Sequence, residues 1–188
     1  KETDIKSIYY ECKQTTERNN VDSLAELIAE IFDFPKPAFE NIEALLQFLF
    51  KMSEKEPMIL VLDEYPYLRE NAKGLDSILQ SLIDHYKDTS NMKFIVCGSY
   101  VDTMKALLEK QNPLYGRIDL TLNLKPMDYY ESALFYPEFT EEDKVRLFSV
   151  FGGIPYYNRL IDGQKSVREN IIELIASPGA RLENEVSM

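Results

Sequence analysis

The chain has 188 residues, of which 45% are hydrophobic, and its net charge is −11. This length predicts one medium domain or one and a half small ones, with enough apolar residues for a core. The negative charge disfavours binding to nucleic acid or to anionic membranes, since either needs clustered Lys and Arg. No apolar run approaches the roughly 20 residues that span a membrane, and the polar start of the chain is unlike a signal peptide. We therefore expect a cytoplasmic protein.

Cysteine and histidine usage argues against a metal cluster or a disulfide framework. Cys12 and Cys97 each fall in a predicted buried strand, so we interpret both as reduced core residues of an intracellular protein. The single histidine, His85, lies in a predicted amphipathic helix and is interpreted as an ordinary helix residue.

Short apolar runs alternate with helical patterns over the first two thirds of the chain. In chain order the elements are a strand (7–12), helices (21–32 and 41–52), a strand (58–63), a polar loop (70–74), a helix (75–86), a strand (93–97), a helix (101–110) and a strand (120–124). Asn20 or Asp22 is the expected cap of the first helix.

Only helices are predicted after about residue 126. They cover 128–136, 141–151, 156–161 and 167–176, with Asp128 and Thr140 as expected caps. The pattern predicts an α/β layer over residues 1–126, followed by a small helical subdomain over 127–188.

The run Met58–Asp63 is apolar until it ends in two adjacent carboxylates, Asp63 and Glu64. Such a run is typical of a parallel strand that is buried on both faces. The acids then lie at the carboxyl end of the strand, where open α/β sheets bind ligands. One carboxylate can be a hard oxygen ligand for Mg²⁺ and the next can orient a water. The alternative is an acidic pair that only ends a strand and opens a loop.

Ser99 ends the next predicted strand, after Gly98. If the two strands are neighbours in a parallel sheet, their ends lie about 5 Å apart. The Ser99 hydroxyl can then hydrogen-bond a water or a phosphate oxygen, while Gly98 allows a sharp turn. The alternative is an ordinary turn between a strand and a helix.

Two further candidates depend on isolated residues. Arg117, in Tyr-Gly-Arg, is either a solvated surface residue or a charge-stabilising finger near a phosphate. Gly153 and Pro155 lie in a Gly-Gly-Ile-Pro sequence, which a helix stop explains by itself.

Taken in order, five strings resemble the archaeal-type ATPases, which are AAA+-like proteins close to the signal-transducing NTPases called STAND. The strings are Ile-Leu-Val-Leu-Asp-Glu-Tyr-Pro-Tyr-Leu from 59, Phe-Ile-Val-Cys-Gly-Ser from 94, Pro-Leu-Tyr-Gly-Arg from 113, Leu-Lys-Pro-Met from 124 and Phe-Gly-Gly-Ile-Pro-Tyr-Tyr from 151. They occur in order, at spacing like that of the family, over nearly the whole chain.

The resemblance implies a role for each candidate residue. Asp63 matches the Walker B carboxylate that holds Mg²⁺, and Glu64 matches the carboxylate that activates water. Ser99 matches the sensor-1 position, and Arg117 matches a candidate finger that acts in cis or in trans. Gly153 and Pro155 match a Gly-x-Pro element whose proline packs on adenine. The implied cofactors are ATP and Mg²⁺.

One part of the family pattern is missing. The phosphate-binding loop, Gly-x-x-x-x-Gly-Lys-Ser/Thr, does not occur in the 188 residues. We therefore expect a partial P-loop NTPase core that binds ATP poorly and hydrolyses it negligibly alone. In the AAA+-like strand order 5-1-4-3-2 the absent strand is the central one, so the sheet would keep open edges through which chains can associate.

Two other functions stay open. One is a non-catalytic interaction module that keeps the fold. The other is a different α/β hydrolase, which would need a nucleophile and a base, although His85 is badly placed to act as one.

Overall fold

The computed structural model describes residues 5–185. The chain divides into two compact units, residues 1–121 and 122–188, whereas the sequence pattern placed the boundary after residue 126. Each unit is described below by itself.

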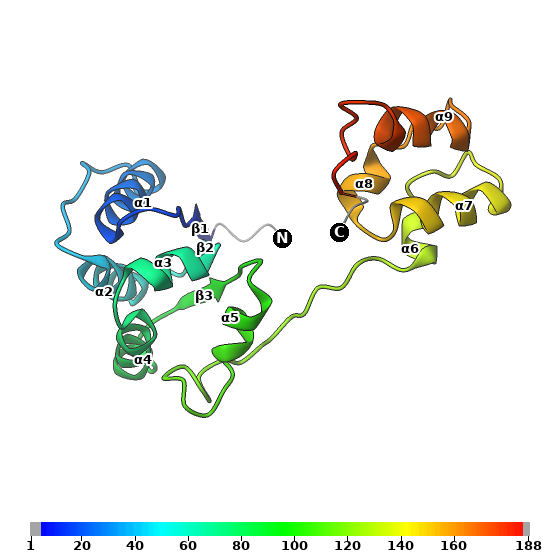
Figure 1. The fold of residues 1–188 in the computed structure, drawn as a ribbon. Coiled ribbons are helices and arrows are strands. Elements are labelled where there is room, and N and C mark those ends of the chain that lie inside the picture. The colour runs from blue at the N-terminus through cyan, green and yellow to red at the C-terminus, as the bar shows by residue number, and fades with distance from the viewer. Residues whose placement is uncertain (1–4, 186–188) are drawn as a thin grey trace. The chain divides into compact units, whose positions relative to one another are not determined.

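The first unit is built on a parallel three-stranded sheet (Figure 1). Its strands are β1 (Lys6–Glu11), β2 (Met58–Asp63) and β3 (Met92–Val96), in the order β1-β2-β3. The register aligns Glu11 with Asp63 and Leu62 with Val96. The predicted α/β class and parallel sheet are confirmed, and the strand β2 has its predicted bounds.

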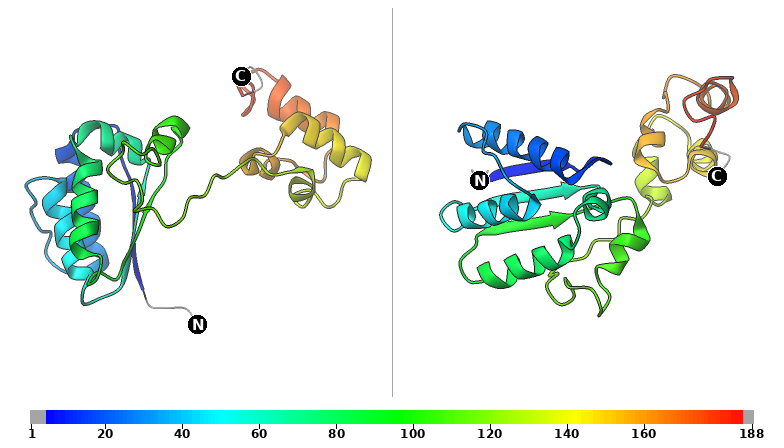
Figure 2. Two further views of the ribbon diagram at one scale, coloured as in Figure 1. Left: turned by 90° about the horizontal axis from the view of Figure 1, so that it is seen from below. Right: turned by 60° about the vertical axis from the view of Figure 1, so that its left-hand side comes forward.

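Five helices accompany this sheet in the described part of the first unit. They are α1 (Glu17–Phe32), α2 (Ile42–Ser53), α3 (Tyr65–Asn71), α4 (Leu75–Tyr86) and α5 (Val101–Ala106). Figure 2 shows α1, α2 and α4 in one layer on the same side of the sheet. The core lies between this layer and the strands.

The sheet is covered on one face rather than on both. Ile8, Leu60 and Leu62 face the helix layer and are fully buried. On the opposite face, Tyr9 is 58% exposed and Ile95 is 47% exposed. The expectation of strands buried on both faces is therefore wrong for the described part of this unit, because its helix layer packs on a single face.

The first helix begins earlier than its apolar spacing indicates. Thr16, and not Asn20 or Asp22, is the cap: its side chain accepts a hydrogen bond from the Asn19 amide. Asn20 is buried and accepts a hydrogen bond of 2.8 Å from the Tyr10 hydroxyl. Because the Asn20 side chain is bonded within the core, it does not cap the helix. Asn20 lies inside α1 instead.

Two segments that follow β2 and β3 differ from the prediction. The residues directly after Glu64 form α3, with Pro66 in its first turn. An N–H group in the first turn has no partner within the helix, so the N–H that proline lacks costs no hydrogen bond there. The loop predicted at 70–74 is shorter as a result. The helix α5 ends at Ala106 instead of residue 110.

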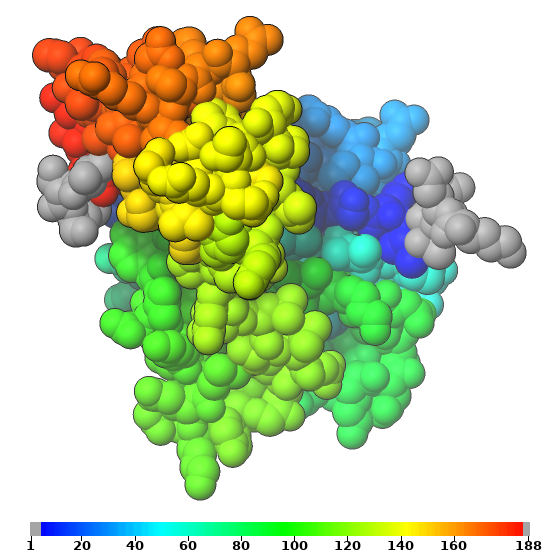
Figure 3. Space-filling model, turned by 90° about the vertical axis from the view of Figure 1, so that its right-hand side faces the viewer, coloured from blue at the N-terminus to red at the C-terminus, as the bar shows by residue number. Residues whose placement is uncertain are grey.

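The strand predicted at 120–124 does not form. Leu120, Leu122 and Leu124 are 72%, 74% and 90% exposed, and this stretch has no strand or helix assignment. It lies in the segment coloured yellow-green on the surface in Figure 3. An alternating pattern forms a strand only where a neighbouring strand supplies hydrogen-bond partners. In the described chain the sheet consists of β1, β2 and β3, and none of them pairs with this stretch.

Both cysteines are free thiols that follow a strand. Cys12, after β1, is buried as expected, whereas Cys97, after β3, is only partly buried.

In its described residues the second unit contains helices and no strands. Its helices are α6 (Tyr129–Ala133), α7 (Glu141–Phe151), α8 (Pro155–Arg159), α9 (Val167–Ile171) and the π-helix η1 (Ile172–Ala176). Asp128 and Thr140 cap α6 and α7 as predicted. Tyr136, Leu147 and Phe151 are central to a separate small core.

A partly buried ion pair, with Asp76 buried and Arg69 about a third exposed, joins three segments of the first unit. The Asp76 carboxylate, at the start of α4, lies 2.8 Å from the Arg69 guanidinium of α3. It also accepts hydrogen bonds from the Tyr65 hydroxyl at 2.7 Å and from the Asn112 side chain at 2.8 Å. Burial opposes ionisation of Asp76, but the bonds from Arg69, Tyr65 and Asn112 outweigh it and hold the pKa of Asp76 below its usual value.

We expect Asp76→Asn to lower the free energy of unfolding by about 2 kcal/mol at pH 7, because it leaves the Arg69 charge unpaired in a partly buried place. Urea unfolding of the full chain measures this. Asp88→Asn is the control, since Asp88 is exposed and the described chain gives it no ion pair.

The pH dependence has a definite sign. The folded pKa of Asp76 lies below the unfolded value, so its stabilisation is complete above about pH 4 and disappears as the pH falls through the folded pKa. The difference between wild type and Asp76→Asn should shrink on acidification. A difference that stays constant from neutral to strongly acidic pH would contradict this account.

Candidate functional site

The candidate site lies at the edge of the sheet where β2 and β3 end. Asp63 is the last residue of β2, and Glu64 and Ser99 lie in the connections that follow β2 and β3. The Glu64 carboxylate accepts a hydrogen bond of 3.1 Å from the Ser99 hydroxyl and a second of 3.3 Å from the Ser99 amide. The parallel pairing of these strands thus brings together three residues that the sequence singled out.

Asp63 accepts hydrogen bonds from both neighbouring strands. The Tyr9 hydroxyl of β1 donates to Oδ2, and the Cys97 thiol after β3 donates to Oδ1 at 3.1 Å. The Glu64 amide donates to Oδ1 at 2.9 Å. The bonds from Tyr9 and then Cys97 hold the pKa of Asp63 below its usual value, so this carboxylate is ionised at neutral pH. The same contact with Asp63 contributes most to raising the pKa of Tyr9 to about 12.

Sequence reasoning did not identify Tyr9 or Cys97 as site residues. Alternation along β1 contained a usable signal, because it places Tyr9 on the opposite face from Ile8 and Tyr10. The β1–β2 register then puts Tyr9 on the same face as Asp63. That register is a tertiary property, so it was not available before the structure.

Glu64 has an unusual backbone. Its φ of 48° and ψ of 41° lie in the left-handed region, which costs a residue with a side chain about 1 kcal/mol or more. The chain turns there from β2 into α3, and the next amide, that of Tyr65, donates to the Cys97 carbonyl at 2.9 Å. The strained turn therefore directs the Glu64 side chain towards Ser99.

Gly98 is required by a close approach rather than by a turn. Its φ is not in the left-handed region. A Cβ atom at this position would lie 2.6 Å from Pro66 Cδ. The missing side chain lets the segment that carries Ser99 pack directly on the first turn of α3.

Arg117 makes its contacts away from the two carboxylates. Its guanidinium pairs with the Asp84 carboxylate of α4 through two contacts, of 2.6 and 2.8 Å. It also donates to the backbone carbonyls of Pro113 and Tyr115. In this structure Arg117 fastens the loop after α5 to α4.

Gly153 and Pro155 belong to the second unit. Gly153 meets another backbone segment, since a Cβ atom there would lie 1.9 Å from the Met127 carbonyl oxygen, and the Met127 amide donates to the Gly153 carbonyl at 2.8 Å. Pro155 begins α8. Both residues thus have a structural role in the second unit.

We expect Tyr9→Phe to raise the pKa of Asp63, because the largest contribution that lowers it is the hydrogen bond from Tyr9. Carboxyl-carbon NMR titration of the full chain measures the shift. Tyr100→Phe is the control: Tyr100 is also exposed but makes no hydrogen bond to Asp63. An unchanged Asp63 pKa in Tyr9→Phe would show that the hydroxyl does not stay on the carboxylate in solution.

We expect Gly153→Ala to destabilise the second unit by about 2–3 kcal/mol, because the new methyl group meets backbone atoms that cannot move freely. Urea unfolding followed by NMR signals of residues 127–176 reports this. Gly163→Ala is the matched control and should cost clearly less, since its neighbour at 2.9 Å is the end of the Glu138 side chain. Equal costs at both positions would contradict this.

Known proteins resemble this chain in sequence and in fold. An uncharacterised protein of Methanocaldococcus jannaschii, MJECL04, is 27% identical over 151 residues, which are 80% of this chain and 32% of that protein. The Walker-type ATPase PABY2304 of Pyrococcus abyssi superposes with a TM-score of 0.64 at 18% identity, covering 88% of this chain and 59% of that one. The chain thus spans about a third and about three fifths of the length of these proteins.

The structural likeness confirms the P-loop ATPase type of fold. A family described as an ATPase domain predominantly from Archaea matches residues 2–160. Because this match covers most of the chain and agrees with the resemblance in the five strings, the chain belongs to that archaeal ATPase-domain family.

Proposed function

We propose that Asp63, Glu64 and Ser99 form the metal-binding and water-orienting half of an ATP-hydrolysing site of the AAA+-like, STAND type. The observation that carries the proposal is the pairing of two carboxylates with distinct surroundings at one strand end. Among the described residues, Asp63 receives three hydrogen bonds and is ionised, while the Glu64 carboxylate accepts bonds only from Ser99. Family membership supports nucleotide as the substrate.

The donor chemistry of Asp63 fits Mg²⁺. Its carboxylate oxygens are hard ligands, and Oδ2 accepts only the Tyr9 bond among described residues, which leaves a lone pair for an ion or an ion-bound water. In the described chain no group of three His, Cys, Asp or Glu side chains can hold a metal alone. The remaining ligands would be phosphate oxygens and water. Mg²⁺, when bound, would neutralise charge on the phosphates.

Glu64 is placed to position a water. Ser99 bonds to Oε2 only, so Oε1 has no donor among the described residues and can accept a proton from water. Ser99 fixes the direction of the carboxylate. Its hydroxyl therefore has a positioning role that matches the sensor-1 assignment.

The other predicted site residues stay proposals. Arg117 would have to exchange Asp84 for a phosphate in order to act as a finger, in cis or in trans. Gly153 and Pro155 would contact adenine through the turn that begins α8.

A non-catalytic interaction module is the second candidate, and specific observations favour it. The described sheet has an exposed face with Tyr9 and Ile95. Unpaired strand edges favour association with further chain segments, including other copies.

For either function we propose a cytoplasmic location and no nucleic-acid partner, given the acidic composition. In the described chain, no helix has the length and apolarity to cross a membrane.

Glu64→Gln should lower ATP turnover by about 100-fold or more, because it removes the group that accepts the proton of water. Nucleotide affinity should stay unchanged. The measurement is ATP hydrolysis and ATP binding by a protein that carries these residues together with an upstream Gly-x-x-x-x-Gly-Lys-Ser/Thr segment.

Glu54→Gln is the control for this experiment, since Glu54 precedes β2 at the opposite end of the sheet. Unchanged turnover in Glu64→Gln would refute the role of Glu64. Absence of any ATP binding by such a protein would favour the interaction module.

A further inference from the structure

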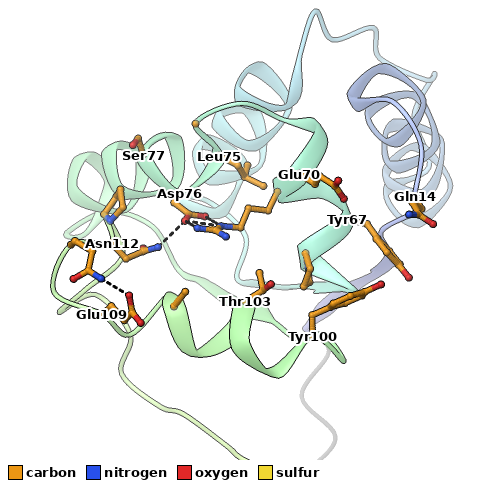
Figure 4. Close-up of a pocket in the computed structure, with 16 residues that line it drawn as sticks. Gln14, Tyr67, Glu70, Leu75, Asp76, Ser77, Tyr100, Thr103, Glu109 and Asn112 are labelled. Carbon is orange, nitrogen blue, oxygen red and sulfur yellow. Dashed lines mark hydrogen bonds and ion pairs between the residues drawn. The ribbon is translucent and has the colours of Figure 1, made fainter.

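A cleft within the first unit, lined among others by Tyr67 of α3 and by Tyr100, is a candidate for a second site. It has a volume of about 750 Å³ and opens between α3, the start of α4 and α5 (Figure 4). Tyr67 and Tyr100 lie together at one end of it, and Glu109 and Asn112 lie at the other. The volume is in the range of sites that take a small molecule or a few peptide side chains.

The charges of the cleft select against anions. Among the described residues that line the cleft, Arg69 is the one cation, and it is already paired with Asp76. Asp76 in turn accepts bonds from Tyr65 and Asn112 as well, so this pair is satisfied internally. A phosphate or a carboxylate would therefore meet no unpaired cationic side chain among these lining residues.

Two carboxylates of the cleft remain without a cationic partner. Glu70 makes no hydrogen bond or ion pair with the rest of the described chain, and Glu109 accepts one bond, from Gln111, on a single oxygen. Both are exposed. They leave the cleft with an excess of negative charge at its two ends.

The aromatic end adds a second feature that suits a cation. The rings of Tyr67 and Tyr100 pack edge to face, with centroids 5.7 Å apart and planes at 71°. Tyr100 is 51% exposed, so a ring surface is open to a partner. An ammonium or guanidinium group over such a ring gains about 0.5–1 kcal/mol at an exposed site.

We propose that this cleft binds a short basic segment of a partner protein, with one Lys or Arg side chain over the Tyr67–Tyr100 pair near Glu70 and a second beside Glu109. The inference does not depend on the proposed ATP hydrolysis. A second copy of the chain is a poor occupant, because each copy carries a net charge of −11.

The test is fluorescence anisotropy of a labelled peptide, Gly-Arg-Gly-Gly-Lys-Gly, titrated with the full chain. Its neutral counterpart carries citrulline and acetyl-lysine in place of the two basic residues, which keeps the shape and removes both charges. We expect the basic peptide to bind and the neutral peptide to bind at least about tenfold more weakly, from the loss of two ion pairs and a cation–π contact.

Variants locate the binding. Glu70→Gln and Glu109→Gln should each weaken binding about threefold, and Tyr100→Ala by a similar factor. Glu54→Gln, which changes the net charge equally but lies away from the cleft, should leave affinity unchanged. Circular dichroism checks the fold of each variant, and the exposure of Glu70 and Glu109 makes both replacements tolerable.

Four results would overturn the proposal. They are equal affinity for the two peptides, no binding of the basic peptide up to millimolar concentration, no effect of Glu70→Gln and Glu109→Gln, and a dimer that dissociates in both Glu→Gln variants. The last result would identify a second copy as the occupant, and sedimentation velocity of the same samples detects it.

Discussion

The parallel register of β1, β2 and β3 is the constraint on which the site depends. Because all three strands run in one direction, their carboxyl ends meet at one edge, and side chains 54 residues apart come into contact there. Asp63 ends the middle strand, so it receives a donor from each neighbour. A shift of one residue in either pairing would turn Tyr9 or Cys97 to the other face of the sheet. The electrostatic state of Asp63 thus follows from backbone pairing.

The bounds of an element were predicted correctly where they depend only on residues of that element and those next to it. The bounds of β2, α4 and α7 follow from an apolar run or a 3.6-residue period that ends at a polar break. The cap residues Asp128 and Thr140 were also visible locally. The positions of Asp63, Glu64 and Ser99 at one sheet edge required only that two parallel strands be neighbours.

The errors arose where a distant partner decides the structure. Residues 120–124 have the alternation of a strand but lack a neighbouring strand. Asn20 looks like a cap, yet Tyr10 holds its side chain in the core. Asp84, the ion-pair partner of Arg117, was likewise not predicted, although the role of Arg117 as a finger stays a proposal. None of these partners can be identified from sequence spacing, because each pairing is set by how helices and strands pack.

The left-handed backbone of Glu64 has a consequence for sequence change over evolutionary time. At such a position glycine or asparagine is the better residue for stability, and a glutamate is disfavoured. Selection for folding alone would therefore tend to remove it. A glutamate retained at this position would indicate that its carboxylate is useful, and relatives without the proposed activity should carry glycine or asparagine there.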